Sequence, residues 1–200
     1  MVLTINTKGE MYMDEIVVYK NPSGNYTPEE VRYMDYIKDH ISKVKKSFDQ
    51  RSAMLQRVMN LSHSEMEELI GRIDNHDASK YSIEEFPAYR NYFYPAEKEA
   101  VNNESFAKAW EHHYKNNDHH PEYWVVNNVP QPMPKVAIAE MILDWEAMSR
   151  NFGGNPRVWY RDSGKALPLH PQTSIEVKRV LDILYTEDLN LKEYRPPILG

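Results

Sequence analysis

The chain contains no cysteine, which removes disulfides, iron–sulfur clusters and thiolate zinc sites from consideration. Any bound metal ion must therefore be held by imidazole, carboxylate and water ligands. Long apolar runs are also missing, because no stretch approaches the ~18–20 residues that span a bilayer. The first ten residues, MVLTINTKGE, lack the charged and then apolar layout of a secretion signal. We expect a cytoplasmic protein that does not contact a membrane.

A surplus of positive charge is absent as well. The chain carries 24 Lys and Arg against 30 Asp and Glu, a formal net charge of -6. This balance argues against a broad basic surface for duplex nucleic acid or anionic lipid, although it leaves room for a local basic pocket that binds a small anion. The length of 200 residues, 41% of them hydrophobic, favours one domain with a sizeable core.

The spacing of apolar residues predicts a mostly α fold, a bundle of about five main helices with a small β element. Two β-branched runs, at 2–5 and 15–19, predict a short hairpin in an N-terminal extension over residues 1–26. Residues 27–200 are expected to form a single helical domain.

Three capping boxes mark helix starts, namely Thr27 with Glu30, Ser62 with Glu65, and Thr173 with Glu176. The main helices are expected over 27–48, from 62 to about 76, over 105–116 and 135–151, and from 173 onward. The aromatic, proline-broken stretch 81–104 predicts one short helix and an irregular loop. The stretch from 155 to 172 is expected to be irregular.

Histidines and acids gather in a pattern that suggests a metal site. The segment WEHHYKNNDHHPEYW, residues 110–124, holds four of the eight histidines: His112, His113, His119 and His120. His76 and Asp77 would continue the buried face of the second helix if that helix persists to them. Candidate ligands also lie on the first and fourth main helices, where they are His40 and Asp144. Four helices thus direct nitrogen or oxygen ligands to one interior, as in metal sites of helical bundles.

Each candidate also has a simpler interpretation. Asp77 could cap a following turn, His40 could be an ordinary helix-face histidine, and Asp144 could be a solvated acid next to the polar Glu140.

Within the histidine-rich segment, His113 is the inward candidate because it shares a helix face with Trp110, whereas His112 is expected to be exposed or to support a ligand. Spacing does not decide between His119 and His120, because helical phase is lost after Asn117.

The order of His40, His76-Asp77 and Asp144 resembles the signature of the HD-domain superfamily. That signature is a His on one helix, a His-Asp pair that closes the next, and a lone Asp on a later helix. HDASK, residues 76–80, is similar to the His-Asp-x-Gly-Lys of the subgroup that hydrolyses cyclic dinucleotides, with Ser79 in place of Gly. The Gly-Tyr-Pro tail of that subgroup is missing, so its specificity does not carry over. In two-metal members, further histidines between the pair and the final Asp bind a second metal, which implies this role for the 112–120 segment.

More narrowly, HDASKYSxxEF, AWxHH, NxHHPEYW and EMxxDWxAMS resemble a family of phage and bacterial proteins with no assigned function. The resemblance covers about residues 30–160. It implies an HD-domain-like helical bundle in the cytoplasm of a bacterium or of a phage-infected bacterial cell.

The superfamily resemblance implies a metal-dependent phosphohydrolase that acts on a nucleotide or another small phosphate ester. One or two divalent transition metals are expected, Mn, Fe, Co or Zn rather than Mg. The expected ligands are His40, His76, Asp77, His113, His119 or His120, and Asp144.

Roles in catalysis are expected for a few further residues. Asp77 would bridge two ions, Lys80 would stabilise the phosphate, and Glu122 would orient a metal-bound histidine or simply cap a turn. Substrate contacts are expected from Lys80, Tyr81, Arg157 and Arg161, each of which could instead be an ordinary core or surface residue.

Two other functions remain open at this level. The same ligands suit an HD-fold di-iron oxygenase, and the fold could also serve a non-catalytic, metal-containing binding protein. The expected partner is a small phosphorylated substrate, and the sequence leaves open whether the chain forms a homo-oligomer.

Overall fold

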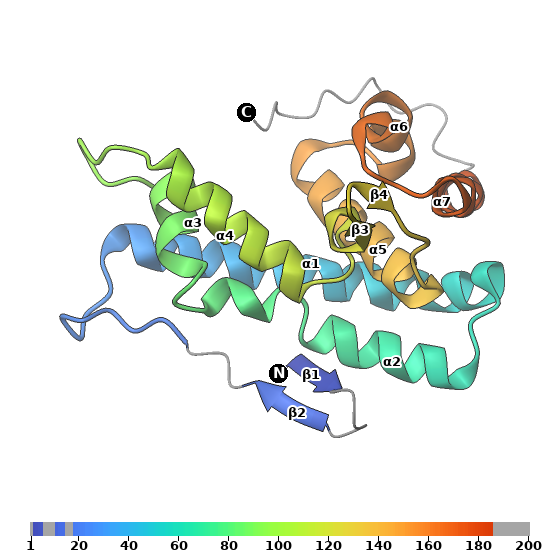
Figure 1. The fold of residues 1–200 in the computed structure, drawn as a ribbon, viewed down its shortest axis with the longest axis horizontal. Helices are drawn as coiled ribbons and strands as arrows, with labels where there is room; N and C mark the ends of the chain where they lie inside the picture. Colours follow the sequence, from blue (N-terminus) through green and yellow to red (C-terminus); the bar gives the residue numbers. More distant parts are fainter. Residues whose placement is uncertain (1, 6–10, 15–17, 186–200) are drawn as a thin grey trace. The chain divides into compact units, whose positions relative to one another are not determined.

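Helices dominate the computed structural model, which describes residues 2–5, 11–14 and 18–185 (Figure 1). The α-helices are α1 (Pro28–Met59), α2 (His63–Asp74), α3 (Phe86–Phe93), α4 (Asn103–Asn116), α5 (Lys135–Phe152), α6 (Pro156–Asp162) and α7 (Pro171–Leu184). Short 3-10 turns are η1 (Ala78–Tyr81), η2 (Pro121–Trp124) and η3 (Gly164–Ala166). The strands form two antiparallel pairs, β1 (Val2–Ile5) with β2 (Met11–Asp14) and β3 (Val125–Val126) with β4 (Val129–Pro130). The predicted mostly α fold with a small N-terminal β element is confirmed.

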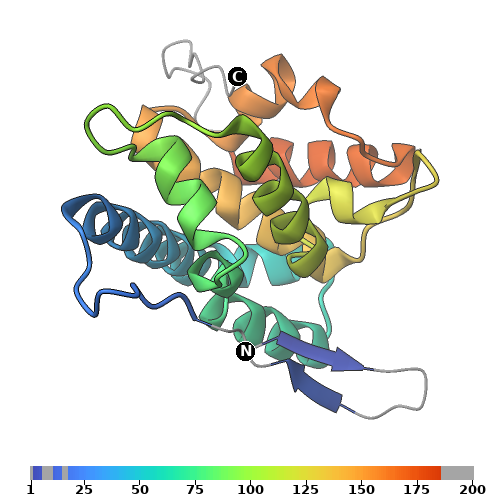
Figure 2. The ribbon, with the colours of Figure 1, turned by 60° about the vertical axis from the view of Figure 1, so that its left-hand side comes forward.

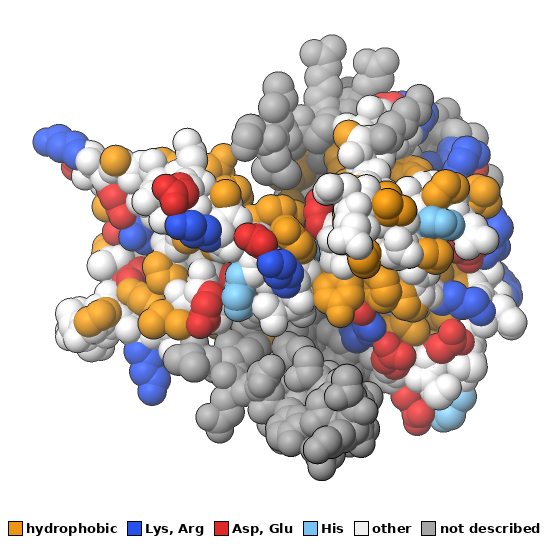
Figure 3. Space-filling model, viewed as in Figure 1, with side chains coloured by type: hydrophobic (Ala, Val, Ile, Leu, Met, Phe, Trp, Pro, Cys, Tyr) orange, Lys and Arg blue, Asp and Glu red, His pale blue; other side chains and the backbone are white. Residues whose placement is uncertain are grey.

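None of the described helices is long and apolar enough to cross a lipid bilayer. On the face that Figure 3 draws, basic and acidic side chains are interspersed among the described residues, without a continuous field of one sign.

The N-terminal hairpin differs in one strand from the sequence prediction. The run at 2–5 is a strand, but it pairs with Met11–Asp14, so that Val2 lies opposite Asp14. Closing this shorter connection costs less conformational entropy than closing a hairpin between residues 2–5 and 15–19. Residues 15–17 lie outside the described residues, and Val18 forms an isolated bridge with Ser82.

Helix α1 begins as predicted and ends later than predicted. Its capping box is formed, because the Thr27 amide donates to Glu30 Oε2 at 2.7 Å and the Glu30 amide donates to Thr27 Oγ1 at 3.2 Å. The predicted end near residue 48 is wrong, since the helix continues to Met59. Residues 49–59 contain no proline or glycine and bury Leu55. The helix ends before Asn60, which has a positive φ of 49°.

The chain divides into two compact units. The first comprises residues 1–39 and 75–117, with the start of α1, η1, α3 and α4. Its core is aromatic: the Tyr33 ring lies 5.0 Å from Phe86, and the Tyr89 ring lies 5.3 Å from Phe106 (centroid distances). The aromatic stretch thus supplies core residues, and its helix is followed by a loop as predicted. Within this unit α3 packs against α4 (Figure 1).

The second unit comprises residues 40–74 and 118–200, with the rest of α1, α2 and α5 to α7. Helix α5 is buried on most sides, as its run of apolar residues predicts, and packs against α2, α6 and α7 (Figure 2). The core around it includes Leu55, Leu69, Ile142 and Leu181. A polar side chain on α5 is therefore presented to a protein interior and needs a partner there.

Two predictions near the C-terminus are wrong. Residues 156–162 form α6, because the Asn155 side chain accepts from the Val158 amide and Pro156 occupies the first turn. Helix α7 begins at Pro171 and is capped by His170, whose Nδ1 accepts from the Gln172 amide. Thr173 lies inside the helix, where its buried hydroxyl accepts from the Met133 amide at 3.0 Å.

Candidate metal centre

Asp77 lies in a turn and not on a helix face. Helix α2 ends at Asp74, so the expected continuation of its face to residues 76 and 77 is wrong. Asp77 has φ 56° and ψ 19°, the left-handed region, which Asp tolerates better than most residues because its short polar side chain bonds locally. Its side chain makes no capping hydrogen bond to η1 and is only 2% exposed. The carboxylate is thus turned inward by a backbone conformation that is costly for a non-glycine residue.

Three basic groups face the Asp77 carboxylate within the first unit. Oδ1 lies 3.3 Å from His113 Nε2, and Oδ2 lies 3.5 Å from His76 Nε2 and 2.5 Å from Lys80 Nζ. Burial alone would raise the pKa of Asp77, but His76, Lys80 and His113 hold it well below its usual value. A buried, ionised carboxylate among imidazoles is a good ligand for a divalent cation.

His113 is fixed from both sides of its ring. It lies near the end of α4 and is buried, as predicted, and its Nδ1 is 2.9 Å from Glu85 Oε2. The second Glu85 oxygen, Oε1, is 2.8 Å from Nδ1 of the half-buried His112. Burial alone would lower the pKa of His113, but the carboxylates of Asp77 and Glu85 raise it. Glu85 was not among the predicted site residues, and its separation of 27 and 28 positions from the two histidines leaves no local sequence signal.

The second unit contains two further pairs, each formed by a buried histidine and an acid. His40 on α1 and Asp144 on α5 lie 3.1 Å apart (Nε2 to Oδ1), with side chains 2% and 13% exposed. His119 Nδ1 lies 3.3 Å from Oε1 of Glu140, which is one turn before Asp144 on α5. His119 is buried and His120 is half-buried, so His119 is the more inward of the two.

Glu140 is part of a charged network in the second unit. Its Oε2 lies 3.3 Å from Arg72 Nη1, and the same guanidinium pairs with Asp118 and Glu68. Arg72 therefore neutralises one side of the Glu140 carboxylate while the other side faces His119. The alternative interpretation of Asp144 as a solvated acid next to Glu140 is not supported, because Glu140 is buried and the Asp144 side chain is 13% exposed.

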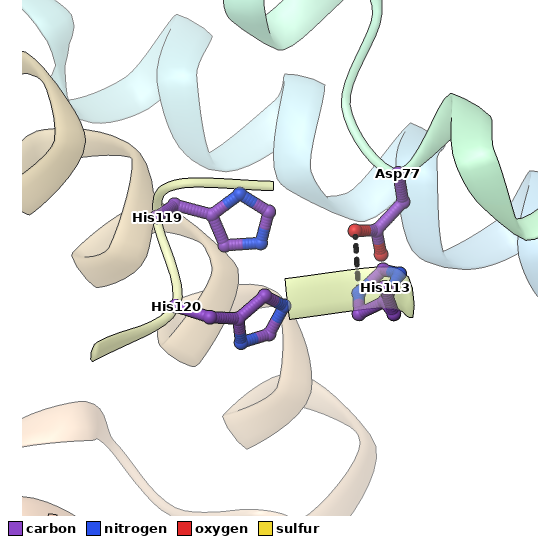
Figure 4. Close-up of side chains that lie close together, drawn as sticks. All are labelled: Asp77, His113, His119 and His120. Atoms are coloured by element: carbon purple, nitrogen blue, oxygen red, sulfur yellow. Dashed lines mark ion pairs between the residues drawn. The ribbon is translucent and has the colours of Figure 1, made fainter. Parts of the chain in front are cut away.

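These side chains fit a metal ion in number and in chemistry. Within the first unit, Asp77 contacts His76 and His113, and Figure 4 draws the ion pair between Asp77 and His113. Within the second unit, His40 contacts Asp144 and His119 contacts Glu140. Imidazole nitrogens mixed with carboxylate oxygens suit Mn, Fe, Co or Zn, and no thiolate is needed. Buried clusters of this kind could hold a metal ion, and they contain the predicted ligands His40, His76, Asp77, His113, His119 and Asp144. His120 lies next to His119, with ring centroids 4.3 Å apart.

The other predicted site residues lie on nearby or separate elements. Lys80 is at the Asp77 carboxylate, and Tyr81 ends η1 half-buried, with its carbonyl accepting from the Tyr19 amide. Glu122 is half-buried in η2. The arginines on α6 are engaged in ion pairs with acids of the same unit, Arg157 with Asp182 and Arg161 with Asp162. The roles assigned to these residues stay predictions.

Fold and site together define a mostly helical protein with buried clusters of histidine and carboxylate that could hold a metal ion. The chain belongs to DUF5662, a family of unknown function whose model matches residues 29–183. No curated protein and no solved structure matches the chain.

Proposed function

We propose that this protein is a metal-dependent phosphohydrolase that acts on a nucleotide or another small phosphate ester. The observation that carries the proposal is the buried Asp77 carboxylate of the first unit, which faces His76, His113 and the ammonium group of Lys80. The similarity of the His40, His76-Asp77 and Asp144 pattern to the HD-domain superfamily supports it independently.

The proposed ligands for one or two ions are those that the sequence predicts, namely His40, His76, Asp77, His113, His119 or His120, and Asp144. A divalent ion supplies Lewis acidity, which lowers the pKa of a water and neutralises charge that develops on phosphoryl oxygens.

Lys80 is proposed to bind the phosphoryl group. Its Nζ is held 2.5 Å from Asp77 Oδ2, and its side chain is 13% exposed. An ammonium group has three donors, so its chemistry suits simultaneous contacts with a carboxylate and with phosphoryl oxygens. Because the side chain is already fixed, little rotamer entropy is lost when the substrate binds. Glu122 is proposed to orient a ligand histidine, and Tyr81 is proposed to contact the substrate.

The test combines elemental analysis with a phosphate-release screen. Protein purified without added metal is analysed for Mn, Fe, Co and Zn, and the same sample is incubated with a panel of nucleotides and phosphate esters. We expect bound transition metal and release of phosphate from at least one substrate. A metal-loaded protein that leaves the whole panel intact would refute the proposal.

Two variants assign the roles. Lys80→Met should retain the metal and lower kcat by roughly 10²-fold, because a charged donor to the transition state is lost. Lys108→Met is the control, since Lys108 is exposed and pairs with the exposed Glu104 on α4, and it should leave kcat unchanged.

An HD-fold di-iron oxygenase is the second candidate, because the donor set of imidazoles and carboxylates suits iron as well as manganese or zinc. An iron-rich preparation that consumes oxygen in the presence of a candidate substrate would favour it over the hydrolase. A metal-containing binding protein would show neither phosphate release nor oxygen uptake.

A further inference from the structure

Glu85 is the most deeply buried acid among the described residues of the first unit, and it was not among the predicted metal ligands. Its side chain is 0% exposed, and its two oxygens face Nδ1 of two consecutive histidines, Oε1 with His112 at 2.8 Å and Oε2 with His113 at 2.9 Å. A buried carboxylate needs hydrogen-bond donors, and the two imidazoles meet this need if each carries a hydrogen on Nδ1.

The consequence for His113 follows from the two nitrogens of its ring. A neutral imidazole has one N–H and one lone pair. If Nδ1–H donates to Glu85, the lone pair is on Nε2, and Nε2 is the atom that lies 3.3 Å from Asp77 Oδ1. Two acceptors at this distance repel each other unless a proton or a cation lies between them. The contact with Glu85 therefore prepares the nitrogen beside Asp77 to bind a cation.

The local backbone holds Glu85 in place for this contact. The residue precedes α3, and its amide donates to Ser82 Oγ at 3.2 Å. Ser79 Oγ also lies near His113 Nδ1, but at 3.3 Å it is farther away than the Glu85 oxygen at 2.9 Å. Asn117 Nδ2 donates to Ser79 Oγ at 2.7 Å and to the His113 carbonyl at 2.8 Å.

We propose that Glu85 is a positioning residue that fixes the ring orientation and the Nε2-accepting tautomer of His113, and that it thereby raises the affinity of the site for a divalent transition metal. This inference rests on the metal-binding part of the proposed function and does not depend on the reaction. Carboxylates that accept from the second nitrogen of a metal-bound histidine commonly contribute a factor of roughly 10–100 to metal affinity.

The experiment measures Zn²⁺ affinity by competition with a chromophoric chelator for the full-length chain and three variants. Glu85→Gln should weaken Zn²⁺ binding by roughly 10–100-fold. His112→Ala removes the other partner of Glu85 and keeps the contact to His113, so it should change the affinity much less. Glu30→Gln is the matched control, because Glu30 is also a buried acid of this unit that accepts from two side chains, those of Tyr19 and Asn21.

A second readout separates positioning from general destabilisation. In Zn²⁺-loaded protein with ¹⁵N-labelled histidine, the His113 ring should show a protonated Nδ1 and a ligated Nε2, and the Nδ1 proton should exchange slowly with water. Glu85→Ala should make this exchange fast or move ligation to Nδ1, whereas Glu30→Gln should leave the His113 signals unchanged even if its melting temperature falls.

The outcomes distinguish the two proposals. Wild-type protein that binds Zn²⁺ with an affinity unchanged by Glu85→Gln overturns the role of Glu85 alone, as does an equal loss in Glu30→Gln. Wild-type protein that binds no divalent metal overturns both proposals. If Glu85→Gln weakens Zn²⁺ binding as expected but the wild type hydrolyses no phosphate ester, only the proposed phosphohydrolase activity is overturned.

Discussion

Replacing Asp77 by Asn tests the candidate site with the smallest change of shape. Asn also tolerates the left-handed conformation at φ 56°, so backbone strain should stay nearly constant. What is lost is a buried negative charge that faces His76, His113 and Lys80 at 3.5, 3.3 and 2.5 Å. Asp77→Asn therefore tests the charge of the side chain, because the side-chain volume and the backbone conformation stay nearly constant.

Two magnitudes follow for Asp77→Asn. Removal of one partner from a buried ion pair costs on the order of 3 kcal/mol, which should lower the melting temperature of metal-free protein by about 6–12 °C for a chain of this size. A ligand at 100 times its Kd stabilises the wild type by about 2.7 kcal/mol, or roughly 5–10 °C. The variant, which lacks the carboxylate ligand, should gain little from the same metal concentration.

The assay is differential scanning fluorimetry with and without Mn²⁺ or Zn²⁺. The gap in melting temperature between wild type and Asp77→Asn should widen when metal is added. Asp74→Asn is the control, because Asp74 is an exposed acid that pairs with Lys45 on the surface. An equal thermal shift in wild type and Asp77→Asn would show that Asp77 is not a ligand, and a shift in neither would remove the metal site itself.

Three further predictions concern other residues. His119→Ala should lower metal-free stability by about 2 kcal/mol, because it opens a cavity at buried Glu140, whereas His120→Ala should cost less than about 1 kcal/mol; urea unfolding compares them. Tyr33→Phe should be neutral or stabilising within about 0.5 kcal/mol in the same assay, because the buried hydroxyl has no hydrogen-bond partner among the described residues. Burial and Glu30 raise the pKa of Tyr19 to about 12, so its stabilising effect should be complete below its usual pKa of about 10 and lost as the pH rises towards about 12. The difference in unfolding free energy between wild type and Tyr19→Phe should therefore shrink across that range, and a constant difference would contradict the assignment.

Helix starts were predictable from the sequence because they depend on neighbouring residues. The Ser62 and Glu65 box forms as expected, with the Ser62 amide donating to Glu65 Oε2 at 2.7 Å. The capping box predicted at Thr173 was wrong. Thr173 lies inside α7, and its hydroxyl accepts from the Met133 amide, 40 positions away in the sequence. The end of α1 was also misread, since no local signal stops a helix before Asn60 and tertiary burial of Leu55 stabilises the added turns.

For the site, the sequence identifies ligand types better than it identifies their supports. His76 and Asp77 were identified because they continue the apolar spacing of the preceding helix, and buried polar side chains need partners. The prediction of burial holds although the helix ends before Asp77. Glu85 and Glu140 were missed as partners because each meets its histidine only through tertiary packing, at 2.9 and 3.3 Å. An acid that orients a ligand resembles any surface acid in sequence.

The two supporting acids differ in what neutralises them, and this difference bears on how the histidines can act. Glu140 is shared between His119 and the guanidinium of Arg72, so part of its negative charge is already compensated by a permanent cation. Glu85 faces two imidazoles and no arginine or lysine among its hydrogen-bond partners in the described residues. An imidazole can lose its positive charge, whereas a guanidinium cannot. Glu85 should therefore form a stronger hydrogen bond with the Nδ1 proton of His113 than Glu140 forms with the Nδ1 proton of His119. His113 should therefore be the more electron-rich ligand of the two, and its replacement should weaken metal binding more than replacement of His119.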